Sequence, residues 1–286
     1  MRKPIRIKFT DFWPTFLLDI HWYDNYFLNL LQKRFKLEFS DEPEVLIYSV
    51  FGTEHQNYSC FKIFYTGENI RPDFNECDFA FTFDHLDQEN HYRLPWYVLN
   101  LKSPDLLVKK ALDIDAIIRS KTKFCNFIYS NETAHKRIQF FKRLSKYKPI
   151  DSAGIVLNNI GGPLKGYEDA KVQFIKDYKF TIAFENSEYP GYTTEKLIQP
   201  MLVHSIPIYW GNPVVHLDFN PKSFLNYYDF PDEEALIERI IELDQDDDLY
   251  RQYLLEPYYH NNQVNPLIEA EAILDQFEKI FKQIQS

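Results

Sequence analysis

One segment, Phe180–Asn212, constrains the fold of this chain more than any other. It reads FTIAFENSEYPGYTTEKLIQPMLVHSIPIYWGN. The short apolar runs at 180–184 and 206–210 suit strands that are buried on both faces. Between them, a turn that contains Gly191 is followed at 195–203 by a largely apolar stretch of helical length. The segment therefore predicts a strand, turn, helix and strand within a parallel sheet that is covered by helices on both sides.

The start of the predicted helix is a candidate ligand site, because open α/β sheets bind ligands beyond the carboxyl ends of their strands. Thr193 or Thr194 can cap this helix, whose unpaired N–H groups and dipole attract an anion. Lys196 adds a full positive charge. Glu195 would repel a phosphate, so we expect it to accept hydrogen bonds from neutral groups such as ribose hydroxyls. The pattern indicates capture of a nucleoside diphosphate, with an ordinary capped helix as the alternative.

The runs FENSEYPGYTTEK and IPIYWGNP closely resemble the signature of the α1,3/4-fucosyltransferases, glycosyltransferase family 10. In that family this region binds GDP-fucose. The resemblance implies four donor-binding residues in this chain: Asn186, Tyr192, Glu195 and Lys196. We add Thr194, which stands at the helix start beside them. Family members commonly use a basic residue from the preceding loop to reach the phosphates. Residues 151–164 contain no Lys or Arg, which departs from the family, and we assign that role to Lys165.

A second stretch, TGEN at residues 66–69, follows a predicted strand at 60–66. The loops beyond strand ends carry function in sheets of this class. TGEN also resembles the family segment that bears its proposed catalytic glutamate, which implies Glu68 as the general base that takes a proton from a sugar hydroxyl. The alternative is a solvated loop glutamate that pairs with Arg71.

The same half of the chain offers polar and aromatic residues for an acceptor sugar. Asp84 follows a predicted strand at 78–83, and His91 and Trp96 come shortly after it. We expect these three residues to contribute to the acceptor site, with interior packing of Trp96 as an equal alternative. Asp84 and His91 are also the next candidates for the base. The Asp and His residues of 84–87 could suggest a metal cluster, but we expect no metal there.

A charged helical connection over 102–120 marks the expected boundary between two domains. Residues 1–120 would form the acceptor-binding domain and residues 121–262 the GDP-fucose-binding domain. In the remaining segment, 263–286, an amphipathic helix would pack back on the first domain, with membrane association as the alternative. The resemblance implies an α/β fold of GT-B architecture, with two facing Rossmann-like domains.

Composition excludes several partners and compartments. The chain has 286 residues, a formal net charge of −10 and a pI near 5.3, which argues against nucleic-acid binding. Its three cysteines lack CxxC spacing, so we expect neither a disulfide framework nor a zinc site, and infer a reducing compartment. No apolar stretch reaches the roughly 20 residues of a membrane span. Animal members of family 10 carry a membrane anchor before the catalytic region, so the resemblance implies a soluble, bacterial-type protein here, with a shortened form as the alternative. We expect it in the cytoplasm, with peripheral contact at the inner membrane as a variant of that expectation.

The function implied by the resemblance is inverting transfer of L-fucose from GDP-fucose to a hydroxyl of an oligosaccharide acceptor. The expected acceptor atom is O3 of N-acetylglucosamine in an N-acetyllactosamine-type glycan. We expect no cofactor besides the donor and no metal, because Lys196 and the helix start can stabilise the departing GDP. Two alternatives remain: a transferase that uses another nucleotide sugar, and a non-catalytic carbohydrate-binding protein on the same scaffold.

Overall fold

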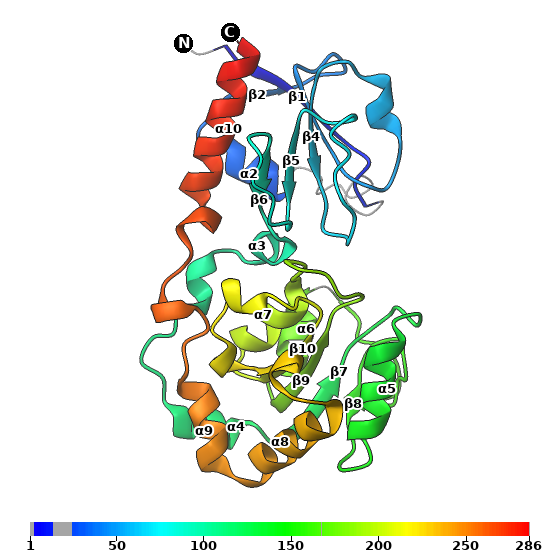
Figure 1. Cartoon of the computed structure of the whole chain (residues 1–286), viewed down its shortest axis with the longest axis vertical. Helices are drawn as coiled ribbons and strands as arrows, with labels where there is room; N and C mark the ends of the chain where they lie inside the picture. The colour runs from blue at the N-terminus through cyan, green and yellow to red at the C-terminus, as the bar shows by residue number, and fades with distance from the viewer. Residues whose placement is uncertain (1–2, 14–24, 167, 286) are drawn as a thin grey trace. The chain divides into compact units, whose positions relative to one another are not determined.

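The computed structural model describes residues 3–13, 25–166 and 168–285, and it divides the chain into two compact units (Figure 1). The first unit consists of Met1–Leu99 together with Asn265–Ser286, and the second is Asn100–Val264. Each unit is built around one sheet, and all strand pairs in both sheets are parallel. This is the α/β class that the alternation of apolar runs and helical patterns predicts.

Among the described residues, the sheet of the first unit has the strand order β2-β1-β3-β4-β5-β6. Its strands are β1 (Ile5–Thr10), β2 (Leu37–Phe39), β3 (Val45–Tyr48), β4 (Phe61–Tyr65), β5 (Phe79–Thr82) and β6 (His91–Arg93). The central strands β3 and β5 are buried along their whole length. Such continuous burial is expected of parallel strands that are covered on both faces.

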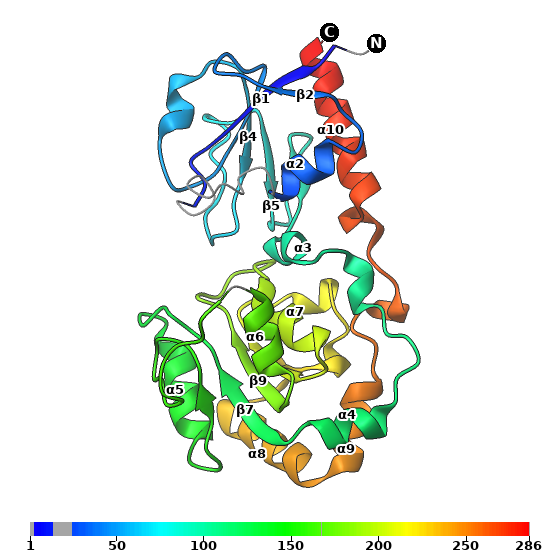
Figure 2. The same cartoon turned by 180° about the vertical axis from the view of Figure 1, so that it is seen from behind.

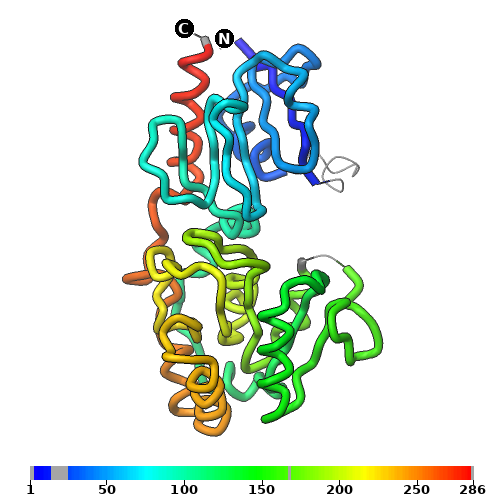
Figure 3. Tube along the Cα trace, turned by 45° about the vertical axis from the view of Figure 1, so that its right-hand side comes forward, coloured from blue at the N-terminus to red at the C-terminus, as the bar shows by residue number. Residues whose placement is uncertain are grey.

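The helices of the first unit include the C-terminal one. They are α2 (Tyr26–Leu31), α3 (Trp96–Asn100) and α10 (Ala270–Gln285), with the short 3-10 turns η2 (Glu54–Asn57) and η8 (Pro266–Ile268). Phe277 of α10 stacks on Phe81 of β5 with 4.7 Å between ring centroids, and it also meets Phe27 of α2. The prediction that the last helix packs back on the first half of the chain is therefore confirmed. The start of β1 and the end of α10 lie close together (Figure 3).

In the second unit the described strands have the order β11-β10-β9-β7-β8. They are β7 (Lys123–Phe127), β8 (Asp151–Ser152), β9 (Tyr178–Phe184), β10 (Ile206–Trp210) and β11 (Leu225–Asn226). The main helices are α4 (Ile114–Ser120), α5 (His135–Leu144), α6 (Glu168–Ile175), α7 (Glu195–Leu202), α8 (Glu233–Gln245) and α9 (Asp247–Leu255). Short 3-10 turns complete the unit: η3 (Pro104–Leu107), η4 (Val215–Leu217), η5 (Pro221–Ser223), η6 (Tyr227–Asp229) and η7 (His260–Asn262).

The element β9–α7–β10 forms as the sequence of Phe180–Asn212 predicts. Phe184 at the end of β9 is level with Trp210 at the end of β10, so both strands present their carboxyl ends at one edge. Helix α7 lies against both strands and beside α6 (Figure 2). The fold thereby places the start of α7 directly beyond the carboxyl end of β9, which is where a ligand site was expected.

The division between the units falls at residue 100, whereas the sequence places it near residue 120. The reason is that α4 packs on α9 and η3 packs on α7, so the connection belongs to the second unit. Likewise, the segment after residue 264 joins the first unit and does not stand alone. None of the helices in the described part of the chain has both the length and the hydropathy that crossing a bilayer requires.

Candidate functional site

The carboxyl end of β9 holds a fully buried carboxylate, Glu185. Its two oxygens accept hydrogen bonds from the backbone N–H of Thr194, at 2.8 Å, and from the Thr194 hydroxyl, at 2.7 Å. Burial raises the pKa of Glu185, although Lys196 and the Thr194 donors act in the opposite direction. Glu185 thus ties the end of the strand to the start of α7.

Lys196 lies in the first turn of α7, behind the capping residue Thr194. Its ammonium nitrogen is 2.9 Å from the Thr194 hydroxyl oxygen and 3.3 Å from a carboxylate oxygen of both Glu185 and Glu195. Burial alone would lower the pKa of Lys196, but the two carboxylates outweigh it and the pKa is raised. A permanent positive charge is therefore fixed at the positive end of the helix dipole.

Glu195 is held between two ammonium groups. One of its oxygens is 3.3 Å from the Lys196 nitrogen and 3.9 Å from the nitrogen of Lys171 on α6. Burial would raise the pKa of Glu195, yet the two lysines outweigh burial and lower that pKa to about 2. Glu195 is consequently ionised at neutral pH and keeps hydrogen-bond acceptor capacity for a ligand.

A buried arginine, Arg137 of α5, reaches the same strand end. Its guanidinium donates to the side-chain oxygen of Asn186 and to the backbone carbonyl of Asn131, both at 2.8 Å, and lies 4.0 Å from the centre of the Tyr129 ring. Within the described residues its Nε atom has no hydrogen-bond partner. Burial lowers the pKa of Arg137 from its ordinary value, although the Tyr129 and Glu185 charges oppose that shift.

The turn between β9 and α7 is locked by Asn212, which follows β10. The Asn212 side chain accepts from the backbone N–H of Gly191 at 2.7 Å and donates to the Thr193 hydroxyl at 3.0 Å. Tyr192 in this turn is buried, and its carbonyl accepts a 3.3 Å hydrogen bond from the hydroxyl of Tyr209. The residues before α7 are therefore held in a fixed conformation.

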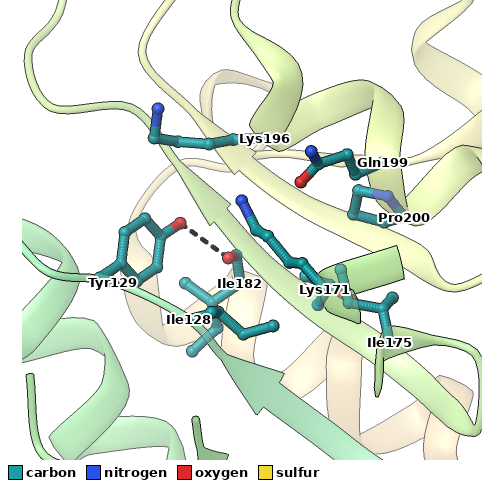
Figure 4. A pocket seen from close by; sticks show the side chains of 9 residues that line it. Ile128, Tyr129, Lys171, Ile175, Ile182, Lys196, Gln199 and Pro200 are labelled. Atoms are coloured by element: carbon teal, nitrogen blue, oxygen red, sulfur yellow. Dashed lines mark hydrogen bonds between the residues drawn. The ribbon is translucent and has the colours of Figure 1, made fainter. Parts of the chain in front are cut away.

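A pocket opens beside the start of α7, between that helix, α6 and the sheet (Figure 4). It is lined by Ile128, Tyr129, Lys171, Ile175, Thr181, Ile182, Lys196, Gln199 and Pro200. The Tyr129 hydroxyl donates to the carbonyl of Ile182 at 2.8 Å, which is the dashed line in Figure 4. The pocket therefore has an apolar floor and two lysine side chains, but its volume of about 10 Å³ leaves room for no more than a water molecule.

In the first unit, Glu68 lies half-buried in the loop after β4. The Thr66 hydroxyl accepts a 2.9 Å hydrogen bond from the Glu68 backbone N–H. No other described residue makes a hydrogen bond or ion pair with the Glu68 carboxylate. Arg71 instead bonds to Asp84 and Asn69 and lies over the Phe83 ring. The ion pair between Glu68 and Arg71 that was considered as an alternative is not formed.

Two candidates for the acceptor site, Asp84 and His91, are buried side chains of one network. The Thr82 hydroxyl donates to Asp84 at 2.7 Å and lies 2.9 Å from the Nε2 atom of His91. Burial lowers the pKa of His91, although Asp84 partly offsets this. Because Asp84 also binds Arg71, the network supports the loop that carries Glu68.

Trp96, the third candidate, packs directly on that loop. A Cβ atom added at Gly67 would lie 2.7 Å from the Trp96 ring, so glycine allows the ring to approach the backbone next to Glu68. The ring centroid of Trp96 is 4.7 Å from that of Trp13. Trp96 is partly buried, and its contact with an acceptor sugar stays a prediction.

Family models cover both halves of the chain. The α-(1,3)-fucosyltransferase FucT N-terminal domain matches residues 7–100, and the C-terminal domain of glycosyltransferase family 10 (fucosyltransferase) matches residues 118–272. The chain belongs to glycosyltransferase family 10. The resemblance of FENSEYPGYTTEK and IPIYWGNP to this family is thereby confirmed.

Two curated relatives of this family 10 chain match it over different lengths. The α-(1,3)-fucosyltransferase FucT of Helicobacter pylori is 32% identical over 278 residues, which cover 83% of this chain and 56% of that protein. The α-(1,3)-fucosyltransferase B of Drosophila melanogaster is 36% identical over 132 residues, which cover 43% of this chain and 30% of that protein. The chain thus spans about half the length of the first relative and less of the second.

Solved structures match nearly the whole chain. A crystal structure of an α1,3-fucosyltransferase with GDP-fucose superposes with a TM-score of 0.81 at 27% identity, over 97% of this chain and 90% of that chain. A structure with GDP gives a TM-score of 0.80 at 28% identity, over 98% and 90% of the two chains. The fold is therefore the two-sheet α/β architecture of GT-B type.

In this family 10 chain, the second unit brings together the predicted Asn186, Thr194, Glu195 and Lys196. Sequence reasoning missed Glu185 and Arg137. A signal for Arg137 exists, because it precedes Phe140 by three residues and so shares the buried face of α5. Lys165 lies exposed in the loop before α6, and its contact with the phosphates stays a prediction.

Acidic clusters give no sign of a metal site. Among the described residues, no group of three or more His, Cys, Asp or Glu side chains is arranged to hold a metal ion. In the acidic run 244–248, Asp246 caps α9 by accepting from the backbone N–H of Asp248 and Leu249. Asp246 therefore serves local structure.

Proposed function

We propose that this family 10 protein transfers L-fucose from GDP-fucose to a hydroxyl of an oligosaccharide. The observation that carries the proposal is the fixed cation, Lys196, at the start of α7, beside the ionised Glu195 and the Arg137–Asn186 pair. Support comes from the similar fold of an α1,3-fucosyltransferase solved with GDP-fucose.

The donor would bind through complementary charges. The diphosphate would meet Lys196, the N–H groups of the helix start and the Arg137 guanidinium, whose Nε atom is free to donate within the described residues. Glu195 would accept hydrogen bonds from the ribose hydroxyls, because its ionised carboxylate would repel phosphate. Asn186 and Tyr192 would complete the donor site.

The chemical step would be a single inverting displacement. Glu68 would take the proton of the acceptor hydroxyl as its oxygen attacks C1 of fucose, while the bond from C1 to the β-phosphate oxygen breaks and GDP departs. Lys196 and Arg137 would stabilise the negative charge that develops on the departing GDP. Glu68 suits the role of base because no other described residue makes a hydrogen bond or ion pair with its carboxylate.

The acceptor would be O3 of N-acetylglucosamine in an N-acetyllactosamine-type glycan, in keeping with the α-(1,3) linkage in the names of the relatives. The partly exposed Trp96 would contact the sugar. The buried Asp84 and His91 would contribute to the acceptor site by supporting the loop on which Trp96 packs. The cysteines at 60, 77 and 125 are all free, which supports a cytoplasmic, reducing environment. Peripheral contact with the inner membrane belongs to the same proposal.

Catalysis would need no metal ion, because Lys196 and the helix start can supply the stabilisation of leaving-group charge that a divalent ion supplies elsewhere. Incubation with a chelator should leave turnover unchanged. Loss of turnover that Mn²⁺ restores would contradict this part of the proposal.

The direct test is a calorimetric titration with GDP and UDP, followed by transfer from GDP-fucose to a panel of N-acetyllactosamine-type glycans. We expect GDP to bind, UDP to bind far more weakly, and fucose to appear on an acceptor. Tighter binding of UDP would indicate another nucleotide sugar. Binding of glycans without any turnover would indicate a carbohydrate-binding protein instead.

A further inference from the structure

Once a donor is bound, the single ammonium group of Lys196 faces three negatively charged groups: two carboxylates and the diphosphate. It is within 3.3 Å of both Glu185 and Glu195, and the proposed function also requires it to contact the diphosphate. An ammonium group that turns toward phosphate weakens its interaction with the carboxylates it leaves. Glu195 would then carry a negative charge close to the negatively charged phosphates.

A second cation stands beside Glu195. In the described part of the chain, Lys171 and Lys196 are the two cations within ion-pair distance of this carboxylate. The Lys171 side chain comes from α6 and is about three-quarters buried. Figure 4 shows it rising through the pocket, with its ammonium nitrogen directed toward the Lys196 side chain.

We propose that Lys171 is a positioning residue of the donor site, which keeps Glu195 ionised and aimed at the ribose hydroxyls while Lys196 engages the diphosphate. This inference rests on the proposed function, because it assumes that the site binds a nucleoside diphosphate. It adds Lys171 to the donor site and gives the two lysines different roles. Lys196 would bind the phosphates, and Lys171 would hold Glu195, the carboxylate that binds the ribose.

The local charge balance supports this division. Glu185 and Glu195 offset the charges of Lys171 and Lys196, so Arg137 leaves the cluster with a net positive charge. Without Lys171 the cluster would be neutral, in a protein whose formal net charge is −10. Lys171 also contributes to the low pKa of Glu195. Once Lys196 turns toward the diphosphate, Lys171 is the cation that offsets the charge of Glu195, so its removal should weaken diphosphate binding while Glu195 is ionised.

The alternative is that Lys171 binds the ligand directly and independently of Glu195. A double-mutant cycle separates the two possibilities, with GDP affinity measured by calorimetry for wild type, Lys171→Met, Glu195→Gln and the double variant. We expect Lys171→Met to weaken GDP binding roughly tenfold in the wild-type background. In the Glu195→Gln background the same change should cost less than about twofold. Equal losses in both backgrounds would overturn the proposal.

The matched control is Lys176→Met, which removes an exposed lysine from the segment that directly follows α6. It should leave GDP affinity unchanged, and melting curves should show that every variant is folded. A wild-type protein that does not bind GDP would refute the proposed function itself. A wild type that binds GDP with additive losses in the cycle would refute only the role of Lys171.

A second readout distinguishes positioning from a merely structural role. If Lys171 keeps Glu195 ionised, the acid limb of the pH profile of GDP affinity should move to higher pH in Lys171→Met. The preference for GDP over 2′-deoxy-GDP should also shrink, since Glu195 would hold the ribose less firmly. An unchanged pH profile together with an unchanged preference would contradict the proposal.

Discussion

Glu68 is the single residue on which the proposed chemistry depends most directly. Glu68→Gln keeps the size of the side chain but cannot accept a proton, so turnover should fall by roughly 10² to 10⁴. Affinity for GDP should stay close to wild type, because the residues proposed for donor binding belong to the second unit. Stability should change by less than about 1 kcal/mol, since Arg71 binds Asp84 rather than Glu68.

The matched control for this variant is Glu89→Gln, which changes an exposed glutamate of the same unit. Steady-state turnover, donor titration and melting temperature, measured on both variants, separate a base from a loop residue. Near-normal turnover in Glu68→Gln would move the base to another residue, with Asp84 and His91 as the next candidates.

The ionisation of Glu195 makes a prediction about stability at acid pH. The pKa of this group is lowered to about 2 in the folded protein, so its contribution is complete above its unfolded value and is lost as pH falls from about 4.5 toward 2. The loss amounts to roughly 2–3 kcal/mol. Denaturant unfolding at pH 5, 4 and 3 should therefore show a shallower decline for Glu195→Gln than for wild type. Parallel declines in the unfolding free energy of the two proteins would contradict the lowering of the Glu195 pKa by Lys171 and Lys196.

The donor residues show what sequence can reveal at this scale. Thr194, Glu195 and Lys196 could be predicted because a cap and the first turn of a helix are local features. Arg137 could not be assigned to the site, because its contact with Asn186 joins a helix to a strand end 49 residues further along the chain. Lys165 was chosen for a phosphate contact by its place in the sequence, whereas Arg137 is the basic residue that contacts Asn186.

At the scale of elements, the close fit between β9, α7 and β10 depends on Gly211. This glycine has φ near +147°, and a Cβ atom there would lie 2.4 Å from the Cγ atom of Glu185. Gly211→Ala should therefore cost roughly 2–4 kcal/mol of unfolding free energy and weaken GDP binding, because Glu185 must move away from Thr194. Chemical denaturation and calorimetry measure the two effects.

Gly161→Ala is the control for backbone strain alone. Gly161 also has positive φ, near +90°, but a Cβ atom there meets nothing within 4 Å. It should cost about 1 kcal/mol and leave GDP affinity unchanged. If both variants lost stability and affinity equally, the contact with Glu185 would not be the cause.

The elements differ in how far their sequence predicts them. The β9–α7–β10 unit was predicted within a few residues, because two buried strands and a capped helix follow one another without interruption. The stretch 102–120 was expected to be one helical connection. Only η3 and α4 form in it, and the packing of α4 on α9 assigns it to the second unit. Because α9 is more than a hundred residues away from α4 in the sequence, local periodicity cannot predict that the two helices pack together.

At the scale of the molecule, α10 completes the core of the first unit. Phe277→Ala should destabilise that unit by roughly 3–5 kcal/mol, since the ring is fully buried against Phe81 and Phe27. GDP affinity should be retained, because the proposed donor residues lie in the second unit. Hydrogen exchange should rise in β4 and β5 and not in β9. Leu267→Ala, which removes an exposed side chain, is the control.

The apolar stripe of α10 shows the limit of sequence at this scale. Its amphipathic pattern predicts a helix with one covered face, yet it does not say whether protein or membrane covers that face. The structure buries the stripe within the first unit, through Ile273, Leu274, Phe277, Ile280 and Phe281. This pairing links residues that are about two hundred positions apart, which no local pattern can encode.

Because α10 follows the second unit in the sequence, the first unit cannot be completed before the second has been synthesised. All of Asn100–Val264 leaves the ribosome before α10 does, so the second unit can fold while the first still lacks one of its helices. Until α10 has been synthesised, the rings of Phe27 and Phe81 cannot pack on Phe277. They then form an uncovered apolar surface that chaperones or other nascent chains can bind. The half of the molecule that is made first is thus the half that is finished last.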